Sequence, residues 1–580
     1  MSQKRLKKIR RQETRNEILD SGIAKHEALP KFWEIIKKNR IFLLVASLLV
    51  VLLYANAIKA DFVSDDYASI TQEARVGDLS YMFLEKAGFG NSQAFTTFLI
   101  YKIFGNSSPV PYHMVSILLY LIFVFIAFAM VKLVTNNDLV AKLTTLLFVF
   151  HPIHVEAVTW ISGRIYIILG IYICLSLINF IYYIDSGKYK YLIFSGLFFI
   201  LGFLTDKPRP FAVFLLMFLY VFYLGWHRVR DRLATLIMPA LIALVVLVVV
   251  AWPYINNRIN VVNSGVNQSE SILYNPFFQY PIAISKYLQM LWLPVDLTLY
   301  HTMYVTPSWL NWMLLIIYLL LVVYFYFKDK RYFFALSFIF LAAAPSMTPI
   351  KVSWLVAERY MFLGSLGFCW FLGLLFSDHW EKFKIVVLGM LFIILSYFGI
   401  RVVTRNKDWG TNHDLWVNTC QVSPNSHNAW NNIGDDYDKL QDYENAVKGF
   451  SQSTIVKPNY ADAYHNRANI FFKVGRLDLA RESYDTALRF SPGLYQTYLS
   501  LTQIDLNEKK LDLALAHAAK AVEIQPGDPQ AMFVYGLVTA ELGKIEEAKS
   551  IFKQILSVYP DYQMARNAYQ KLLEVGAGKS

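Results

Sequence analysis

Two neighbouring aspartates, Asp65 and Asp66 in the run FVSDDY, directly follow a long apolar stretch of the chain. A carboxylate at such a boundary between hydrocarbon and water is partly desolvated, which raises its pKa and suits it to act as a general base. A structural role is the alternative, because aspartate is also a favoured N-cap of a short helix. The residues alone leave both roles open.

A second group of ionisable residues lies in the run HPIHVEAVTWISGR, between two further apolar stretches. It contains His151, His154, Glu156 and Arg164. Ionisable side chains near the membrane are costly, so they tend to mark functional sites. Histidines three residues apart with a nearby glutamate could present ligands to a metal ion, but an intervening proline disturbs the spacing and no further ligand completes a set. We therefore favour no metal, and expect this corner to bind an anionic substrate or to bond with the first loop.

Two more charged pairs stand at the ends of apolar stretches. They are Lys207 and Arg209 in TDKPRP, and Glu358 and Arg359 in VAERYMFLGS. Arginine can hold a phosphate through two parallel hydrogen bonds and lysine can hold it as a point charge, so a bound lipid phosphate would explain these residues. The alternatives are contact with lipid headgroups for the first pair and mutual pairing for the second.

The elements that must position these residues are membrane helices. The chain has 580 residues, of which 56% are hydrophobic and only 17% are charged. Ordinary soluble domains carry about 25% charged residues. Long apolar runs fill residues 41–404, whereas a single soluble core stops growing near roughly 250–300 residues. The predicted fold class is therefore all-α, with a polytopic membrane helical bundle in this part of the chain.

Apolar runs of spanning length predict about eleven helical spans. They cover residues 41–59, 115–134, 139–156, 164–184, 190–205, 210–226, 233–254, 309–328, 332–346, 359–377 and 384–404. A shorter apolar stretch at 278–293 is predicted to be interfacial or re-entrant, and the segment 91–104 is predicted to lie along the membrane surface.

Lysine and arginine orient these spans. Residues 1–40 form a basic tail, which the positive-inside rule places in the cytoplasm, and nearly every short loop on that side is also basic. Nucleic-acid binding by the tail is the less favoured interpretation. With eleven spans, the charged groups described above and the C-terminal domain fall on the non-cytoplasmic side. A miscount by one span would move the C-terminal domain to the cytoplasm.

Internal repetition defines the C-terminal part of the chain. Prolines recur every 34 residues, at Pro424, Pro458, Pro492, Pro526 and Pro560. Alanines keep the same phase, at Ala446, Ala480, Ala514 and Ala548. This is the tetratricopeptide period, so we predict a linker over 405–423 and a solenoid of four repeats over 424–575. The concave surface of such a solenoid is typical of protein or peptide binding, and stabilisation of the membrane part is the alternative.

FVSDDY, HPIHVEAVTWISGR and AERYMFLGSLGF, followed by tetratricopeptide repeats, resemble the transmembrane and tetratricopeptide-repeat O-mannosyltransferases (TMTC), which are multi-spanning GT-C glycosyltransferases. HPIHVEA and AERY are fairly specific, whereas a lone DD is weak. The resemblance implies transfer of a sugar, mannose or a similar hexose, from a polyprenyl-phosphate donor to serine or threonine hydroxyls of a protein on the non-cytoplasmic side.

By this resemblance Asp65 or Asp66 is the catalytic carboxylate, and the related protein O-mannosyltransferases favour Asp65. It would deprotonate the acceptor hydroxyl while basic groups stabilise the growing charge on the phosphate. The candidate basic groups are Arg164, Lys207, Arg209 and Arg359, and we expect His151, His154, Glu156 and Glu358 to belong to the same substrate-binding site. The chain departs from the animal proteins in having only four clear repeats and in having TDKPRP where a lysine–glutamate pair is expected. The short array favours a protein of the bacterial inner membrane, or of the ER membrane if eukaryotic.

The implied partners are a lipid-linked sugar donor, a protein or peptide acceptor held by the repeat groove, and membrane lipids, but no nucleic acid. The sequence assigns no cofactor, and it leaves a divalent metal open without favouring one. A transporter is the weakest alternative, because the membrane part shows no matching halves and its polar groups gather at one face. A non-catalytic membrane scaffold that presents the repeats is the stronger alternative, and it predicts that both aspartates are dispensable.

Overall fold

A computed structural model describes residues 29–86, 91–207, 209–225, 229–230, 276–302, 308–347 and 355–577. In these ranges the chain is helical and contains no β-strand, which confirms the predicted all-α class. The chain divides into two compact units. The membrane unit lies within residues 1–299 and 304–411, and the repeat unit lies within residues 300–303 and 412–580.

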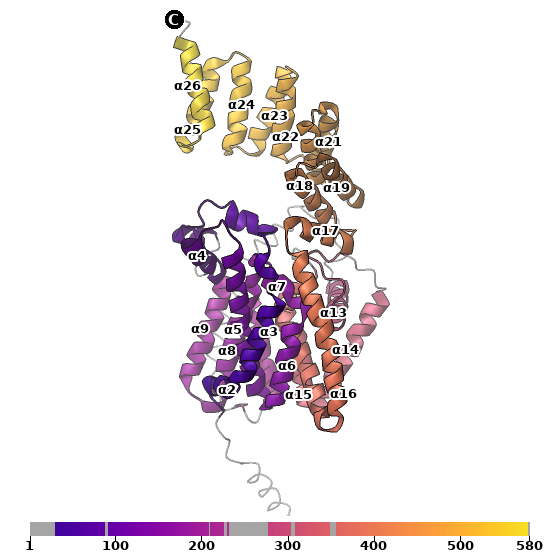
Figure 1. The fold of residues 1–580 in the computed structure, drawn as a ribbon. Helices are drawn as coiled ribbons and strands as arrows, with labels where there is room; N and C mark the ends of the chain where they lie inside the picture. Colours follow the sequence, from indigo (N-terminus) through magenta and orange to yellow (C-terminus); the bar gives the residue numbers. More distant parts are fainter. Residues whose placement is uncertain are drawn as a thin grey trace, which may run out of the picture. The chain divides into compact units, whose positions relative to one another are not determined.

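The membrane unit is a bundle of helices that run side by side (Figure 1). Its helices are α2 (Phe32–Lys38), α3 (Arg40–Leu53), α4 (Ser92–Phe104), α5 (Val110–Thr135), α6 (Asp138–Phe150), α7 (Val155–Thr159), α8 (Ile165–Ser186), α9 (Tyr189–Thr205), α10 (Ala212–Leu224), α13 (Pro276–Trp292), α14 (Ser308–Lys328), α15 (Lys330–Ala343) and α16 (Gly364–Asp408). Short helical turns connect them: η1 (Ala57–Lys59), η2 (Tyr67–Thr71), η3 (Tyr81–Lys86), η4 (Pro152–His154), η5 (Ile161–Arg164), η6 (Arg209–Phe211), η8 (Ala344–Ser346) and η9 (Glu358–Met361).

Four of the described helices are long and apolar enough to cross a membrane: α5, η5 with α8, α14, and α16. Helix α6 passes the same test together with η4 and α7, but the pair is bent by 58°. The shorter apolar helices are α3, α9 and η6 with α10. These helices support a multi-pass membrane protein.

The predicted spans 359–377 and 384–404 fall on the two sides of a kink in α16, where Phe383 leaves helical geometry (φ −130°, ψ 36°). The predicted span 233–254 lies outside the described residues. The count of eleven spans therefore stays a prediction.

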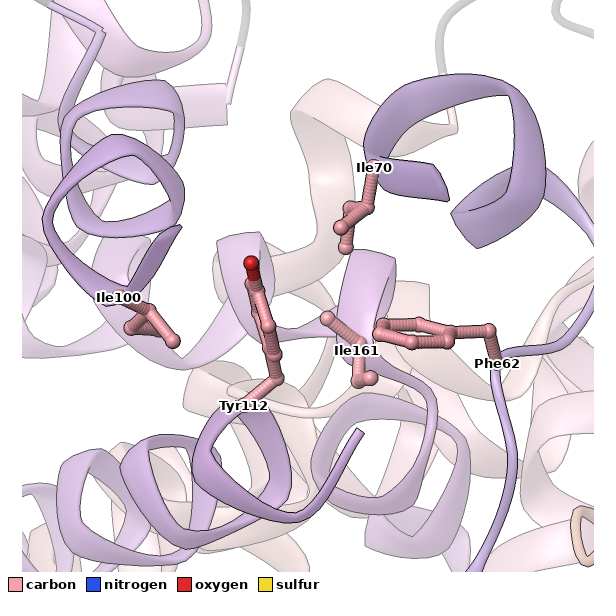
Figure 2. Packing of buried hydrophobic residues seen from close by; sticks show 5 residues of the cluster. All are labelled: Phe62, Ile70, Ile100, Tyr112 and Ile161. Carbon is pink, nitrogen blue, oxygen red and sulfur yellow. The ribbon is translucent and has the colours of Figure 1, made fainter. Parts of the chain in front are cut away.

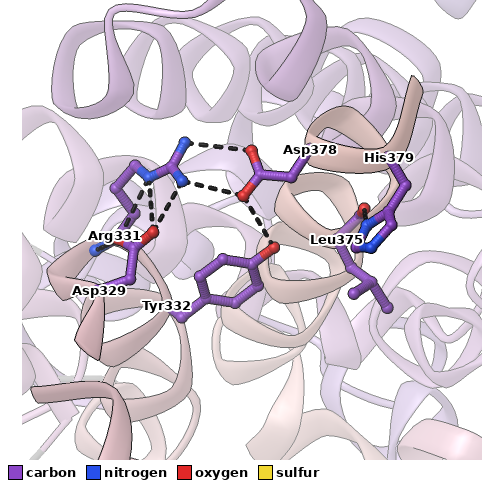
Figure 3. A network of polar contacts seen from close by, with 6 residues as sticks. All are labelled: Asp329, Arg331, Tyr332, Leu375, Asp378 and His379. Atoms are coloured by element: carbon purple, nitrogen blue, oxygen red, sulfur yellow. Dashed lines mark hydrogen bonds and ion pairs between the residues drawn. The ribbon is translucent and has the colours of Figure 1, made fainter. Parts of the chain in front are cut away.

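Polar residues begin and join these helices where the apolar runs stop. The side chain of Asp329 caps the start of α15 by accepting a hydrogen bond from the backbone N–H of Arg331. Figure 3 shows how Arg331 also reaches α16, where its two Nη atoms lie 3.2 and 2.9 Å from the carboxylate of Asp378. The hydroxyl of Tyr332 donates to the same carboxylate at 3.1 Å. This network fixes the start of α15 against α16.

A close backbone approach joins α6 to α16. A Cβ atom on Gly373 of α16 would lie 2.4 Å from the Oγ1 atom of Thr144 and 3.0 Å from its backbone nitrogen. Only glycine therefore allows the two helices to approach this closely, since real Cβ contacts are longer. The corner that follows α6 is thereby held against the body of the bundle.

The repeat unit consists of antiparallel helix pairs (Figure 1). It begins with α17 (Asn412–Val422), which lies in the stretch predicted as a linker, and continues with α18 (His427–Lys439), α19 (Tyr443–Val456), α20 (Ala461–Lys473), α21 (Leu477–Phe490), α22 (Tyr495–Asn507), α23 (Leu511–Ile524), α24 (Pro529–Glu541), α25 (Ile545–Val558) and α26 (Gln563–Ala577). The phased alanines are fully buried, which lets the helices of each pair approach closely. The predicted tetratricopeptide solenoid is confirmed.

Candidate functional site

The first loop after α3 presents its two aspartates differently. Asp65 is exposed, whereas Asp66 is fully buried. The Oδ1 atom of Asp66 accepts hydrogen bonds from the backbone nitrogen of Ser162 at 2.9 Å and from its hydroxyl at 2.5 Å, and Oδ2 accepts from the backbone nitrogen of Val63 at 3.3 Å. Ser64, just before the pair, has the left-handed backbone angle φ 53°, which is uncommon for a residue other than glycine. The loop is therefore bonded to the corner that ends at Arg164, through Asp66.

An apolar cluster supports this junction. Figure 2 shows Phe62 of the loop beside Ile161 of η5, with Ile70 of η2 above them and Ile100 of α4 and Tyr112 of α5 on the other side. All five side chains are buried. Because the cluster joins the loop, α4, α5 and η5, it fixes the backbone on both sides of Asp66.

The corner also contains Arg164, whose charge acts on the carboxyl of Asp66. Arg164 is 1% exposed, and its Nη2 atom donates to the hydroxyl of Thr97 on α4 at 2.7 Å. Its Nε and Nη1 atoms have no hydrogen-bond partner among the described residues. A buried donor without a partner costs about 1–3 kcal/mol, and more when it is charged. Two unused donors on one buried guanidinium therefore point to an anionic or polar ligand.

A cavity of about 250 Å³ lies beside Arg164. Its polar lining consists of Ser69, Asn91, Gln93, Thr97, Ser162 and Arg164, and its apolar lining consists of Ile70, Met82, Ala94 and Ile161. We call this cavity the arginine cavity. The amide of Gln93 donates to the backbone carbonyl of Ser162 at 2.9 Å, so α4 and η5 form one continuous wall.

The environment of Asp66 changes its proton affinity. Burial raises the pKa of this carboxyl to about 7, although the hydrogen bonds from Ser162 and Val63 and the charge of Arg164 act in the opposite direction. A carboxyl with a pKa near neutrality can exchange a proton at physiological pH. The loop thus combines one exposed carboxylate with one buried, proton-holding carboxyl.

Two of the predicted basic residues lie elsewhere and are already paired. Arg359 forms an ion pair with Glu156, whose Oε2 atom also accepts the backbone N–H of Arg359 at 2.7 Å. Arg209 forms an ion pair with Asp206 and donates from Nε to the hydroxyl of Ser346 at 3.2 Å. The two arginines line a small cavity of about 30 Å³, close to the space of one water molecule. Their charges are therefore largely satisfied within the protein.

Glu358 takes part in a different buried pair. Its Oε1 atom lies 3.1 Å from Nη2 of Arg405, which also pairs with Asp408 at 3.1 Å. Burial raises the pKa of Glu358 to about 7 against the effect of Arg405. Arg405 was not among the predicted site residues. The sequence feature that could have identified Arg405 is its position directly after the predicted span 384–404, which resembles the position of Lys207 shortly after the predicted span 190–205.

Both predicted histidines are fully buried and bonded within the membrane unit. The Nε2 atom of His151 lies 3.0 Å from the carbonyl oxygen of Leu291, and Nδ1 accepts the backbone N–H of Ile153. The ring nitrogens of His154 lie 3.0 Å from the hydroxyl of Tyr120 and 2.7 Å from that of Ser365. Neither histidine lines the arginine cavity. Lys207 is exposed and does not line it either.

Of the ten predicted site residues, the structure thus forms two separate groups: Asp66 and Arg164, with Asp65 adjacent to Asp66 in the chain, and Glu156 and Arg359 with Arg209. Within the described ranges, no three His, Cys, Asp or Glu side chains gather as metal ligands would. Thr97, Gln93 and Ser162 belong to the cavity but carry no sequence signal of their own, because uncharged polar residues are common throughout the chain.

The repeat unit has its own hollow. A groove of about 360 Å³ is lined by Asp435, Asp438, Phe450, Asn466, Asn469, Phe472, Lys473, Tyr484, Ser500 and Gln503. Most of these side chains come from α18, α20 and α22, the first helix of each pair. The lining thus combines amide, hydroxyl and carboxylate groups with aromatic side chains. Such a lining suits an extended polypeptide, because the polypeptide backbone offers both hydrogen-bond donors and acceptors.

Comparison with known proteins shows which families the two parts of the chain resemble. Residues 93–254 match the family described as dolichyl-phosphate-mannose-protein mannosyltransferase, and residues 431–495 and 529–562 match tetratricopeptide repeats. The human protein O-mannosyl-transferase TMTC3 is 22% identical over 409 residues, which cover 62% of this chain and 44% of that protein. Mouse TMTC3 is 30% identical over 112 residues, covering 18% of this chain and 12% of that protein.

The chain therefore spans less than half of the length of these two relatives. The solved structure of YrrB, a tetratricopeptide-repeat protein, is 18% identical, with a TM-score of 0.25, and the match covers 34% of this chain and 97% of that one. A mannosyltransferase segment followed by tetratricopeptide repeats confirms the resemblance drawn from the motifs. The segment contains Gln93, Thr97, Ser162 and Arg164 of the arginine cavity.

Proposed function

We propose that this chain, a multi-pass membrane protein with a mannosyltransferase segment and C-terminal repeats, is a protein O-glycosyltransferase. It transfers mannose, or a similar hexose, from a polyprenyl-phosphate donor to serine or threonine hydroxyls of a protein. The distribution of Lys and Arg supports transfer on the non-cytoplasmic side, with the repeats on that side. The short repeat array supports the inner membrane of a bacterium as the location.

One observation carries the proposal: a buried arginine, two of whose donor atoms have no partner among the described residues, lines a polar cavity beside the aspartate loop. Arg164 can donate from Nε or from Nη1 to a phosphate oxygen, while Nη2 stays on Thr97. These two atoms lie on different edges of the planar guanidinium, so each can reach a separate anionic oxygen. Arg164 therefore stabilises the negative charge that develops on the phosphate when the bond to the sugar breaks.

Asp65 is the general base in this proposal. Its side chain is exposed and can meet an acceptor hydroxyl, whereas the oxygens of Asp66 are bonded to Ser162 and Val63. The acceptor oxygen attacks C1 of the sugar, the bond between C1 and the phosphate oxygen breaks, and the hydroxyl proton passes to Asp65. The electron pair of the broken bond leaves with the polyprenyl phosphate. Asp66 holds the loop on the corner during this step.

The repeat groove supplies the acceptor in this proposal. Its polar lining fits a segment that carries serine or threonine, because hydroxyl and amide groups can satisfy such side chains and the backbone together. The competing function is a non-catalytic scaffold, which the same groove would also serve.

The test is sugar transfer by the purified full chain. Polyprenyl-phosphate donors carrying radiolabelled mannose or glucose are incubated with serine- and threonine-containing peptides and with wild-type, Asp65→Asn or Asp78→Asn protein. Loss of a general base lowers the turnover by about 10²–10⁴-fold, so we expect that loss in Asp65→Asn. Asp78, an exposed aspartate of the same loop region, is the control and keeps full activity.

Two results would contradict the proposal. Absence of transfer from every donor with the wild-type protein would favour the scaffold. Equal transfer by wild type and Asp65→Asn would remove Asp65 as the base.

A further inference from the structure

A single buried amide near the end of α16 connects three separate segments of the membrane unit. Asn406 is 2% exposed. Its Nδ2 atom donates to the carbonyl oxygen of Leu53 at 2.9 Å and to Oδ1 of Asn56 at 2.8 Å, and its Oδ1 atom accepts from the hydroxyl of Thr159 at 2.8 Å. These partners lie 353, 350 and 247 residues away in the chain. The end of α3, the start of the aspartate loop and the corner before Arg164 therefore meet at one side chain.

Neighbouring positions of α16 hold the same loop. The amide of Asn56 donates to the carbonyl oxygen of Val403 at 2.9 Å. The backbone nitrogen of Asp61 donates to the carbonyl oxygen of Gly410 at 2.8 Å. The last turns of α16 thus bind the loop where it leaves α3, and Gly410, two residues after α16, binds it again four residues before Asp65.

The end of α16 is itself fixed by contacts that do not involve the loop. The rings of Trp409 and Trp160 stack, with centroids 5.7 Å apart and planes 24° apart. Arg405 is fully buried and pairs with Glu358 at 3.1 Å. Asn406 therefore lies on a helix end that these contacts hold in place. Its hydrogen bonds fix the loop relative to that helix end.

The loop needs such an external frame, because it has little regular structure of its own. Between Leu53 and Ser64 only the three-residue turn η1 is helical, and Asp65 and Asp66 begin the helical turn that continues into η2. Downstream, Asp66 is bonded to Ser162. Upstream, the loop is attached to the end of α16 and to Gly410 through Asn56 and Asp61. The exposed carboxylate of Asp65 lies between these two attachments, so its position depends on both.

We propose that Asn406 is a positioning residue that fixes the aspartate loop for sugar transfer. The inference rests on the proposed function for its effect on catalysis, but the effect on the loop itself can be measured independently. A group misplaced by about 1 Å can cost about 10²-fold in rate, even when the substrate still binds.

The experiment uses the full chain with Asn406→Leu, which keeps the branching at the γ carbon and removes all three side-chain bonds. Asn56→Ala is the milder variant for the case that the first one does not fold. Asn179→Leu is the matched control, because within the described part of the chain the amide of Asn179 bonds only to the carbonyl oxygen of Leu175 in its own helix. Amide hydrogen exchange and the kcat and KM for the donor are measured for each.

We expect exchange to rise in peptides covering residues 53–66 in both loop variants, while peptides of α5 and α8 stay protected. We expect kcat to fall by about 10²-fold, with KM for the donor unchanged. The control should change neither quantity.

Unchanged exchange over residues 53–66 would overturn the inference, and so would a uniform rise over the whole membrane unit, which would mean general destabilisation. A parallel change of kcat and KM would also overturn it. If the wild-type protein transfers no sugar, the proposed function fails, and the exchange measurement alone decides the role of Asn406.

Discussion

Replacing Asp66 with asparagine tests whether the loop holds a buried proton. Asparagine keeps one oxygen for the two bonds from Ser162, but it places an NH₂ group opposite the backbone N–H of Val63. Losing the hydrogen bond from Val63 costs about 1–3 kcal/mol at every pH, because neither the asparagine amide nor the backbone N–H titrates. What distinguishes wild type from variant is therefore the pH dependence of loop closure, not its value at one pH.

We call the loop closed when Asp66 is buried against Ser162, as in the structure, and open when Asp66 is exposed to water. The size of the pH effect on closure follows from the pKa of Asp66, which burial raises from 3.8 to about 7 in the closed loop. Below about pH 4 the carboxyl is protonated in both the closed and the open loop, and the contribution of the group to closure is fully present. Between about pH 4 and 7 only the closed loop keeps the proton, so closure weakens by about 1.4 kcal/mol per pH unit. Above about pH 7 the loss levels off near 4 kcal/mol.

The assay is amide hydrogen exchange of residues 61–71 between pH 4.5 and 7.5, corrected for the intrinsic exchange rate at each pH. We expect protection to fall with rising pH in the wild type and to stay constant in Asp66→Asn. Asp65→Asn, at the exposed neighbour, is the control and should follow the wild type. A wild-type loop that gains protection as the pH rises would refute the reasoning, because Arg164 and the Ser162 bonds would then outweigh burial.

Three further outcomes are expected. Arg164→Gln removes the charged donor from the arginine cavity and should lower sugar transfer by about 10²–10³-fold, whereas an unchanged rate would place the phosphate elsewhere. Gly373→Ala should lower the thermal stability of the membrane unit through a clash that costs about 1–3 kcal/mol, and Gly389→Ala, whose Cβ has no neighbour within 4 Å, should not. Glu358→Gln removes the buried negative charge that pairs with Arg405 and should destabilise the unit by about 3–5 kcal/mol, as measured by a lower unfolding temperature; equal unfolding temperatures would show that Asp408 compensates.

Local patterns in the sequence predict the elements of this protein well. Within the described residues, apolar runs predict helices in the right places, since helix formation in a membrane depends on continuous hydrophobicity. The run at 139–156 is an exception, because α6 ends at Phe150 and the chain then bends by 58°. The 34-residue period predicts the repeats, because each repeat buries the same alanine against its partner helix.

Composition and spacing also mark the charged corners, but they do not say which charges pair. Arg164, Arg209 and Arg359 are equivalent candidates in the sequence. In the folded chain Arg209 and Arg359 pair with carboxylates, whereas two donor atoms of Arg164 have no partner in the ranges that the structure describes. These pairings are made across the bundle, so no local pattern contains them.

What the sequence determines by itself is therefore the class of the molecule: a helical membrane bundle, a tetratricopeptide solenoid, and a loop and corner rich in ionisable groups. The tertiary structure alone decides that Asp66 is buried while Asp65 is exposed, and that Asn406 holds the loop from 350 residues away. The physical reason is that hydrophobic periodicity is a property of neighbouring residues, whereas burial, ion pairing and hydrogen bonding of a side chain depend on which distant segments pack around it.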